Sequence, residues 1–219
     1  MATVLITGCN RGIGLELCRQ YHARGDKVIG VCRNSNSDLD ALGIRAIDNV
    51  DISTDEGVAR MAVALADVAI DIVVNNAGIL RSDTLDTVDF DEMLEQYRVN
   101  TMGPLRIALA LKGNLGDGAK FGIVSSRVGS VEDNSSGNNY GYRCSKAAAN
   151  MVGMNLRHDL AAKGVAVVLL HPGLVATEMT GGLGVSPEKS ACGLIARMDE
   201  LTMETSGSFW HAEGYSLPW

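Results

Sequence analysis

One tyrosine in the chain stands in a spacing that suits acid–base chemistry. Of the five tyrosines, only Tyr142 has a lysine four residues later, Lys146. On a helix this spacing puts both side chains on one face, a turn apart. An ammonium beside a phenol favours the phenolate and lowers its pKa from about 10, so the pair can transfer a proton near neutral pH. When no other motif accompanies it, a tyrosine and lysine at this spacing are more often an exposed pair on a helix. Tyr140 has Cys144 at the corresponding position and is interpreted as a packing residue.

A glycine-rich segment near the start of the chain has the composition of a phosphate-binding turn. Residues 7–14 read Thr-Gly-Cys-Asn-Arg-Gly-Ile-Gly and join an apolar run to a segment of helical periodicity. Gly8 permits a tight turn, Gly12 removes a Cβ where a pyrophosphate would lie, and Gly14 lets the helix pack closely on the strand. The new helix offers free N–H groups to an anion. This position, between strand and helix, favours a dinucleotide site over a purely structural turn.

The residues after the second apolar run indicate which dinucleotide would bind. An acidic residue there is typical of NAD binding, and arginine suits the 2′-phosphate of NADP. The run ends at Cys32, Arg33 follows, and no acidic residue occurs before Asp38. Arg11 can approach the same phosphate from the glycine turn, and two guanidiniums suit a dianion. We expect NADP(H) rather than NAD(H), with a plain surface arginine as the alternative interpretation of Arg33.

The elements that must position these residues alternate along the chain. Short apolar runs predict strands at 4–6, 28–32, 44–47, 70–74, 121–124 and 165–170. Helical patterns cover 12–24, 58–68, 89–111, 142–162 and 187–202. Continuous apolar strands are buried on both faces. The alternation predicts an α/β fold with a single Rossmann-type, doubly wound parallel sheet flanked by helices on both faces. The polar stretches 113–118 and 132–139 read as loops within one domain, 1–219.

Composition excludes several classes of protein. The chain has 219 residues, a net charge of −7 and 25 glycines, so a nucleic-acid or anionic-membrane surface is not expected as the main partner. The longest apolar run, 165–170, is too short to span a bilayer, and no signal peptide is recognised. The five cysteines have no metal-ligand spacing. We expect a cytoplasmic protein with reduced thiols and no metal.

In order and spacing, the motifs resemble those of the short-chain dehydrogenase/reductase (SDR) family. After the glycine turn, the motifs that carry the resemblance are Asn75-Asn-Ala-Gly78, Asn100, Ser125-Ser126 with Gly129, Tyr142 with Lys146, and His171-Pro-Gly173 with Thr177. The resemblance runs from residue 3 to about 180. Within the family, the chain is most similar to the small carbonyl reductases that include the C-factor and sniffer proteins.

The resemblance implies an enzyme that transfers a hydride between NADPH and a ketone or aldehyde, reversibly. Tyr142 would supply the proton, and Lys146 would also bind the nicotinamide ribose. Ser126 would polarise the substrate carbonyl, with Ser125 as the alternative; the gap to the following glycine favours Ser126. Asn100 would hold a water that relays protons from Lys146, or it would repair a bulge in its helix.

The expected cofactor residues combine the glycine turn, the two arginines and the family positions, of which Asp51 would contact adenine. They are Gly8, Asn10, Arg11, Gly12, Ile13, Gly14, Arg33, Asp51, Asn75, Ala77, Gly78, Tyr142, Lys146, Pro172, Gly173, Val175 and Thr177. His171 is interpreted as a strand-end residue held by backbone contacts rather than as a residue facing the nicotinamide.

The substrate side and the assembly are open to more than one interpretation. The short, glycine-rich stretch 178–187 predicts a mobile or open substrate loop, which would suit bulky or varied carbonyl compounds. Met151, Met154 and Leu156 lie on the helix of Tyr142, which in the family often packs against a second subunit, so a homodimer and core packing are equal alternatives. The rival function is an NADP(H)-binding signalling or regulatory protein of the C-factor type. The complete set of Asn100, Ser126, Tyr142 and Lys146 favours the enzyme.

Overall fold

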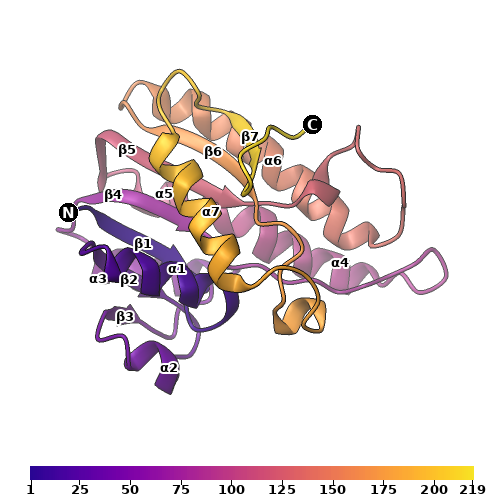
Figure 1. Cartoon of the computed structure of the whole chain (residues 1–219), viewed down its shortest axis with the longest axis horizontal. Helices are drawn as coiled ribbons and strands as arrows, with labels where there is room; N and C mark the ends of the chain where they lie inside the picture. The colour runs from indigo at the N-terminus through magenta and orange to yellow at the C-terminus, as the bar shows by residue number, and fades with distance from the viewer.

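Seven parallel strands form one sheet in the computed structural model, which describes residues 1–219 (Figure 1). The strands are β1 (Thr3–Thr7), β2 (Lys27–Val31), β3 (Arg45–Ile47), β4 (Ile70–Asn75), β5 (Leu115–Val124), β6 (Ala166–His171) and β7 (Ser208–His211). Their order in the sheet is β3-β2-β1-β4-β5-β6-β7, and every pair is parallel. The predicted doubly wound Rossmann-type fold is confirmed.

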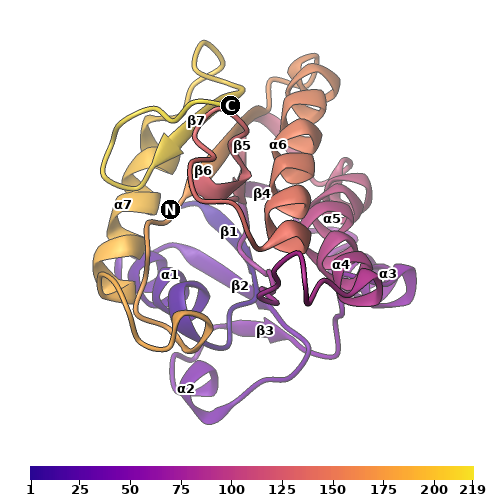
Figure 2. The same cartoon turned by 90° about the vertical axis from the view of Figure 1, so that its right-hand side faces the viewer.

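Helices cover both faces of the sheet (Figure 2). On one face lie α1 (Gly12–Ala23) and α7 (Pro187–Glu200). On the other lie α3 (Asp55–Ala64), α4 (Phe90–Tyr97), α5 (Gly103–Leu111) and α6 (Tyr140–Ala161). Shorter elements are α2 (Ser37–Asp40), the π-helical turn η1 (Arg98–Met102) and the 3-10 turns η2 (Arg127–Gly129) and η3 (Glu178–Thr180).

The core is divided by the sheet into two apolar clusters. In β1, Leu5 belongs to the cluster of 25 residues under α3, α5 and α6, whereas Val4 and Ile6 belong to the cluster of 20 residues under α1 and α7. Successive side chains of a strand point to opposite faces, so a strand covered on both sides must be apolar throughout. This requirement explains the continuous apolar runs in the sequence.

Several details of the fold differ from the sequence prediction; β7 and α2 were not predicted, and the helix predicted over 58–68 is α3, Asp55–Ala64. The stretch 113–118 was predicted to be a loop, which is wrong, because β5 already begins at Leu115 and pairs there with Ile70. The register then shifts, so that Ile72 pairs with Lys120 and the polar residues between occupy an irregular part of the strand. The single helix predicted over 89–111 is divided by η1 into α4 and α5, and α6 begins two residues earlier than predicted.

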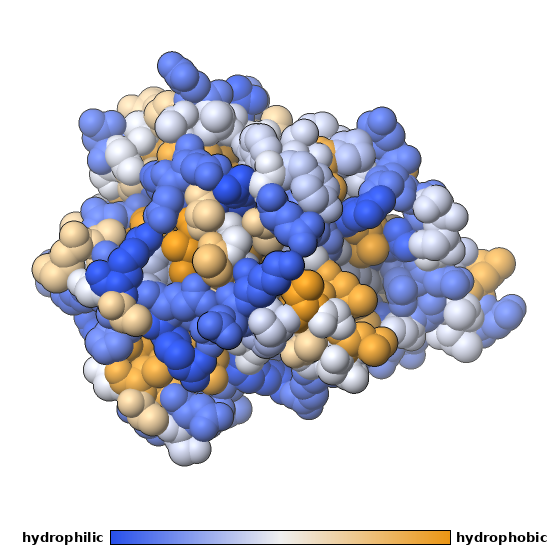
Figure 3. All heavy atoms as spheres, in the orientation of Figure 1, coloured by the Kyte–Doolittle hydropathy of each residue, from blue (hydrophilic) through white to orange (hydrophobic).

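The surface is mostly hydrophilic in the face shown in Figure 3, where apolar residues stand in small groups. None of the helices combines the length and the apolar character that a bilayer-spanning segment requires. All five cysteines are free; three are buried, and Cys144 and Cys192 are exposed.

Candidate active site

A cleft of about 700 Å³ opens at the carboxyl ends of the strands. Its walls include the segments that follow β1 to β6, together with two residues of α6, Tyr142 and Lys146. The strand order reverses between β1 and β4. Such a switch point is where open α/β sheets bind their ligands, so this cleft is the candidate site.

Most residues expected from the sequence border this cleft. They are Gly8, Asn10, Arg11, Gly12, Ile13, Arg33, Asp51, Ala77, Gly78, Tyr142, Lys146, Pro172 and Thr177. The expected residues that do not border it are Gly14, Asn75, Asn100, Ser126, Gly173 and Val175. Residues of the cleft that were not expected include Asn76, Ile79, Leu80, Arg81 and Met179.

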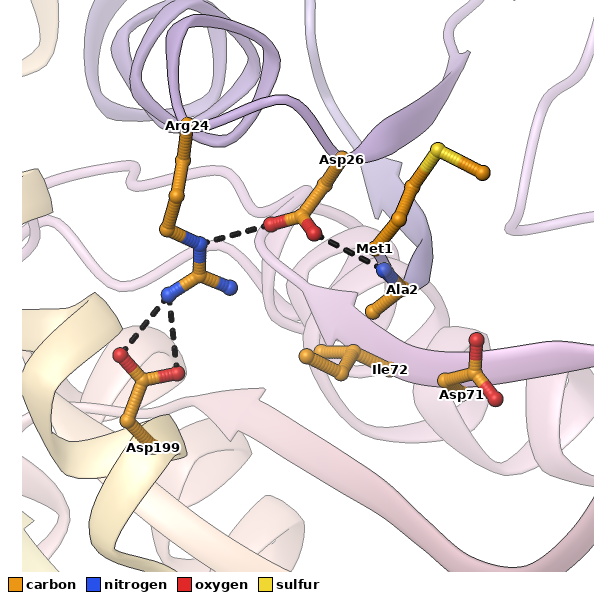
Figure 4. Close-up of a pocket in the computed structure, with 7 residues that line it drawn as sticks. All are labelled: Met1, Ala2, Arg24, Asp26, Asp71, Ile72 and Asp199. Carbon is orange, nitrogen blue, oxygen red and sulfur yellow. Dashed lines mark hydrogen bonds and ion pairs between the residues drawn. The ribbon is translucent and has the colours of Figure 1, made fainter.

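A second cavity, of about 580 Å³, lies at the opposite edge of the sheet (Figure 4). Its charged groups already bind one another: the Arg24 guanidinium donates to Asp26 at 2.7 Å and to Asp199 at 2.8 Å. Asp26 also accepts a hydrogen bond from the backbone N–H of Ala2 at 2.8 Å. These contacts fasten α1 and the chain start to α7, and they give this cavity a structural role.

The glycine turn has the backbone geometry that a phosphate site requires. Gly8 and Gly12 have positive φ values of +66° and +53°, a region that favours glycine. A Cβ on Gly14 would lie 2.0 Å from the carbonyl oxygen of Gly8, so the predicted close packing of the helix is present. A Cβ on Gly12 would meet Thr177 at 3.2 Å.

The start of α1 is free to bind an anion. Its N-cap residue, Arg11, makes no side-chain capping bond, and the first turn contains no acidic residue. The N–H groups at a helix N-terminus need an acceptor, and the helix dipole favours a negative one. A dinucleotide pyrophosphate in the cleft would satisfy both conditions.

The two asparagines after β4 have different roles. The Asn76 amide donates to the carbonyl oxygens of Thr7 and Gly8, both at 3.1 Å, and so ties the glycine turn to the end of β4. Asn75 is buried in the sheet and donates to the Gly122 carbonyl at 3.2 Å. The structure therefore places Asn75, expected to bind the cofactor, inside the sheet and away from the cleft.

The far end of the cleft contains the charged residues expected at the adenosine. Arg33 is exposed and has no hydrogen-bond or ion-pair partner for its side chain. Arg11, expected beside it on one phosphate, instead forms an ion pair with Glu178 of the substrate loop. Burial acts to raise the pKa of Asp51, but hydrogen bonds from the Ser53 N–H (2.8 Å) and hydroxyl (2.7 Å) lower it below its ordinary value.

Tyr142 and Lys146 form the centre of the site. The Lys146 ammonium donates to the Val124 carbonyl at 2.9 Å and lies 5.7 Å from the centre of the Tyr142 ring. Burial lowers the pKa of Lys146 to about 8 and raises that of Tyr142 to about 12, although a hydrogen bond with Ser126 acts to lower the latter. The sequence predicts that Lys146 lowers the phenol pKa; in this structure burial raises it instead.

The two adjacent serines after β5 are used differently. The Ser125 hydroxyl borders the cleft but donates to the Asn150 side chain at 2.6 Å, beneath α6. The Ser126 hydroxyl accepts a weak hydrogen bond from the Val128 N–H at 3.3 Å and interacts with the Tyr142 phenol. Of the two hydroxyls, that of Ser126 is the one paired with the tyrosine.

Asn100 lies in the π-helical turn η1, and both polar atoms of its side chain have hydrogen-bond partners. Its amide oxygen accepts from the Ile79 N–H at 2.9 Å, and its NH₂ group donates to the Ile79 carbonyl at 2.9 Å and to the Ser145 hydroxyl at 3.0 Å. Asn100 therefore holds the cleft-wall segment after Gly78 against α6. A relay water bound to this residue would have to use the second lone pair of the amide oxygen or the backbone carbonyl.

The substrate loop is short and is anchored at its base. Ala176 and Val185 are joined by a backbone hydrogen bond of 2.8 Å, and Val185 donates to the Leu174 carbonyl at 2.9 Å. Its tip, around Leu183, is exposed. Glu178 and Met179, at the start of the loop, border the cleft.

His171, at the end of β6, has its main chain fixed by the neighbouring segment, because its carbonyl accepts from the Ala212 N–H at 2.8 Å. Its ring packs edge-on against His211 at 4.9 Å, and Nδ1 has no partner. Burial, followed by the charge of His211, lowers its pKa to about 3, so the ring is neutral at physiological pH.

Comparison with known proteins is in accord with this geometry. The sequence profile described as short chain dehydrogenase matches residues 2–186. The chain belongs to the short-chain dehydrogenase family. A crystal structure of NADPH-bound carbonyl reductase from chicken fatty liver superposes on this short-chain dehydrogenase with a TM-score of 0.90 at 28% sequence identity, covering 100% of this chain and 94% of the other.

Two curated relatives have more specific descriptions. A protein of Rhodococcus sp. (strain AD45), described as 1-hydroxy-2-glutathionyl-2-methyl-3-butene dehydrogenase, is 46% identical to this short-chain dehydrogenase over 100% of both chains. C-signal of Myxococcus xanthus is 38% identical over 68% of this chain and 93% of that protein. The chain is thus an oxidoreductase by family, with an enzyme and a signal protein among its relatives.

Proposed function

We propose that the protein is an NADPH-dependent oxidoreductase that reduces a ketone or aldehyde to an alcohol, reversibly. The observation that carries this proposal is that Tyr142, whose pKa Ser126 acts to lower, and Lys146, 5.7 Å from the Tyr142 ring centre, both border the cleft at the switch point of the sheet. Two hydroxyls that donate hydrogen bonds to the same substrate oxygen can polarise a carbonyl, and one of them can then protonate the alkoxide.

The cleft fits a dinucleotide. The uncapped start of α1 would bind the pyrophosphate, Asp51 would accept from the adenine amino group, and Lys146 would bind the nicotinamide ribose. NADPH supplies the hydride when it is bound. The free guanidinium of Arg33 supports NADP(H) over NAD(H), and the NADPH-bound avian reductase supports it too.

The side chains divide the remaining work. Ser126 would donate to the substrate oxygen and hold it against the phenol. Tyr142 would then transfer its phenolic proton to that oxygen as negative charge develops. Lys146 would stabilise the resulting phenolate, which burial otherwise disfavours. Asn100 would keep the wall of the cleft, at Ile79, in place during these steps.

The short substrate loop suits a bulky substrate. The Rhodococcus relative is described as acting on a glutathionyl-substituted alcohol, and its identity extends over the full length of both chains. Alcohols and aldehydes that carry a thioether-linked peptide are therefore included in the substrate class that we propose.

A signalling or regulatory role is the second candidate, supported by the similarity to C-signal. A protein that only senses NADP(H) has no need of a proton donor, so the intact Tyr142, Ser126 and Lys146 favour turnover. The discriminating experiment is a panel of ketones, aldehydes and glutathionyl alcohols, with NADPH formation or loss followed by absorbance. Turnover of one class supports the enzyme; tight NADPH binding without turnover of any class would support the rival.

We further propose a homodimer in the cytoplasm. The free cysteines suit a reducing compartment. The dimer is supported by exposed apolar side chains on α4, η1 and α5, here called the α4–α5 stripe: Phe90, Leu94, Tyr97, Met102, Leu105 and Leu109. Of the three candidate contacts on α6, Met151 is exposed, Met154 is partly buried and Leu156 belongs to the core.

The spacing of the α4–α5 stripe suits a two-fold axis. Its members are separated by four, three, five, three and four residues, and an isologous interface needs a patch that matches itself in reverse. Five residues of α-helix would rotate Met102 about 140° away from Tyr97. The π-helical turn η1 lies between them and takes more residues per turn, which keeps both halves on one face.

A further inference from the structure

The segment that follows β4 connects the wall of the cleft with the start of the catalytic helix. Its residues from Gly78 to Arg81 border the cleft. Asn100 binds both backbone groups of Ile79, and the buried Gln96 side chain accepts from the Arg81 N–H at 2.9 Å. Two residues further on, Asp83 is buried and binds a different element.

Asp83 caps α6 from a distant part of the chain. Its carboxylate oxygens accept from the N–H groups of Tyr140 (2.6 Å) and Gly141 (3.1 Å), 57 and 58 residues away. Its own carbonyl accepts from the Asn139 N–H at 2.8 Å. Asn139, the local N-cap residue, is left-handed with φ +52° and makes no side-chain capping bond. Asp83 therefore replaces the missing local cap and places a negative charge at the positive end of the helix dipole.

The two capped N–H groups directly precede Tyr142. A helix whose first N–H groups lose their acceptor frays at that end, and the phenol stands on the third residue of α6. Gly141 is also packed closely, since a Cβ there would lie 2.5 Å from the Gln96 amide nitrogen. Asp83 therefore holds the backbone from which the phenol projects.

We propose that Asp83 is a positioning residue for the reaction. By capping α6 from the segment that follows β4, it holds the Tyr142 phenol in place relative to the cleft wall at residues 78–81. This inference rests on the proposed function and adds a residue to it. Because Asn100 and Gln96 hold the cleft wall independently, loss of Asp83 should impair proton transfer while NADPH binding is preserved.

The test compares Asp83→Ala with a matched control, Asp89→Ala. Asp89 caps α4 in the same way, accepting from the N–H groups of Asp91 (2.8 Å) and Glu92 (3.2 Å), but α4 carries none of the reacting groups. Both variants should lose a few degrees of Tm. Only Asp83→Ala should lower kcat, by about tenfold or more, with the KM for NADPH changed less than about twofold.

A conservative variant keeps the test valid if the alanine variant fails to fold. Asp83→Asn retains one amide oxygen as an acceptor and should recover part of the lost kcat. The kcat of Asp83→Ala is compared with that of Asp89→Ala; if Asp83→Ala does not fold, Asp83→Asn takes its place. Equal kcat in the two variants would overturn the proposal. A loss of activity that appears wholly in the KM for NADPH would also overturn it.

A measurement without substrate separates failure of this proposal from failure of the proposed function. Amide hydrogen exchange over residues 139–146 needs no turnover. Asp83→Ala, or Asp83→Asn in its place, should accelerate exchange at the first turn of α6 by about tenfold, and Asp89→Ala should leave it unchanged. Unchanged exchange in the Asp83 variant would contradict the capping role even if no carbonyl compound is ever reduced.

Discussion

Lys146 is the residue at which burial and charge oppose each other most directly. It is 4% exposed, and its pKa of about 8 lies below the ordinary 10.5 because burial disfavours the ammonium. Between these two values the unfolded chain binds more protons at this residue than the folded one, so the residue adds stability as pH rises through that window. Below pH 8 both states are charged, and the cost of burial is constant.

At neutral pH, Lys146→Met should therefore gain stability relative to the wild type. We expect its free energy of unfolding, relative to the wild type, to be highest at pH 7 and to fall by about 3 kcal/mol between pH 8 and 10.5. Urea unfolding of both proteins at several pH values measures this difference. The lost hydrogen bond to Val124 shifts the difference by a constant, so a difference that does not vary with pH would contradict the assigned burial.

Arg33 decides the cofactor in this account. Arg33→Asp should weaken NADPH binding by about 10- to 100-fold, because a charge-assisted bond to the 2′-phosphate is replaced by repulsion. NADH binding should change by less than about threefold. Fluorescence titration with both nucleotides measures this, with Arg60→Asp, an exposed arginine of α3, as the control. Equal weakening of both nucleotides would exclude the phosphate contact.

The residues that sequence could predict are those whose partners lie nearby in the chain. Tyr142 and Lys146 are one turn apart on one helix, and the glycine turn is continuous. Asp83 and Asn76 have their partners 57 to 69 residues away, so only the folded chain reveals them. The ion pair of Arg11 with Glu178 was missed for the same reason.

At the scale of elements, the apolar runs and helical periodicity predicted most strands and helices. They did not predict where these elements are interrupted. The irregular start of β5 contains polar residues that imitate a loop. The π-helical turn η1 depends on the contacts of Asn100 with Ile79 and Ser145, which lie outside its helix. A helix bulge at Asn100 was one of the two interpretations offered for that residue, but composition alone signals neither feature.

The junction of β1 and α1 has no room for a side chain at Gly14. Gly14→Ala would place a Cβ 2.0 Å from the Gly8 carbonyl oxygen, and the clash should cost about 2 kcal/mol or more. Both Tm and NADPH affinity should fall, as measured by thermal melting and titration. Gly113→Ala, with no atom within 4 Å of the new Cβ, is the control and should change neither. Wild-type affinity in Gly14→Ala would show that the turn is not required for binding.

For the whole molecule, the net charge of −7 is a poor guide to the ligand that we propose, because Arg33 and the start of α1 would form a local anion site. The fold class followed from the sequence, because a doubly wound sheet needs apolar strands alternating with helices. The assembly did not follow, because exposure on α4 and α5 depends on the phase set by η1.

The proposed dimer is tested by molar mass in solution. Light scattering should give twice the 23.2 kDa of one chain. Leu94→Glu, in the α4–α5 stripe, should give a monomer, because a charge in an apolar interface is costly to bury. Val63→Glu, at a still more exposed position on α3, should remain a dimer. A monomeric wild type, or dissociation of both variants alike, would refute the proposed interface.

The most direct test of the central claim is the turnover of Tyr142→Phe with NADPH and a carbonyl compound that the wild type reduces. The variant should bind NADPH with unchanged affinity, because the phenol hydroxyl is the only group removed. Loss of the proton donor should lower kcat by about 10²- to 10⁴-fold. NADPH oxidation at the wild-type rate in Tyr142→Phe would contradict the account.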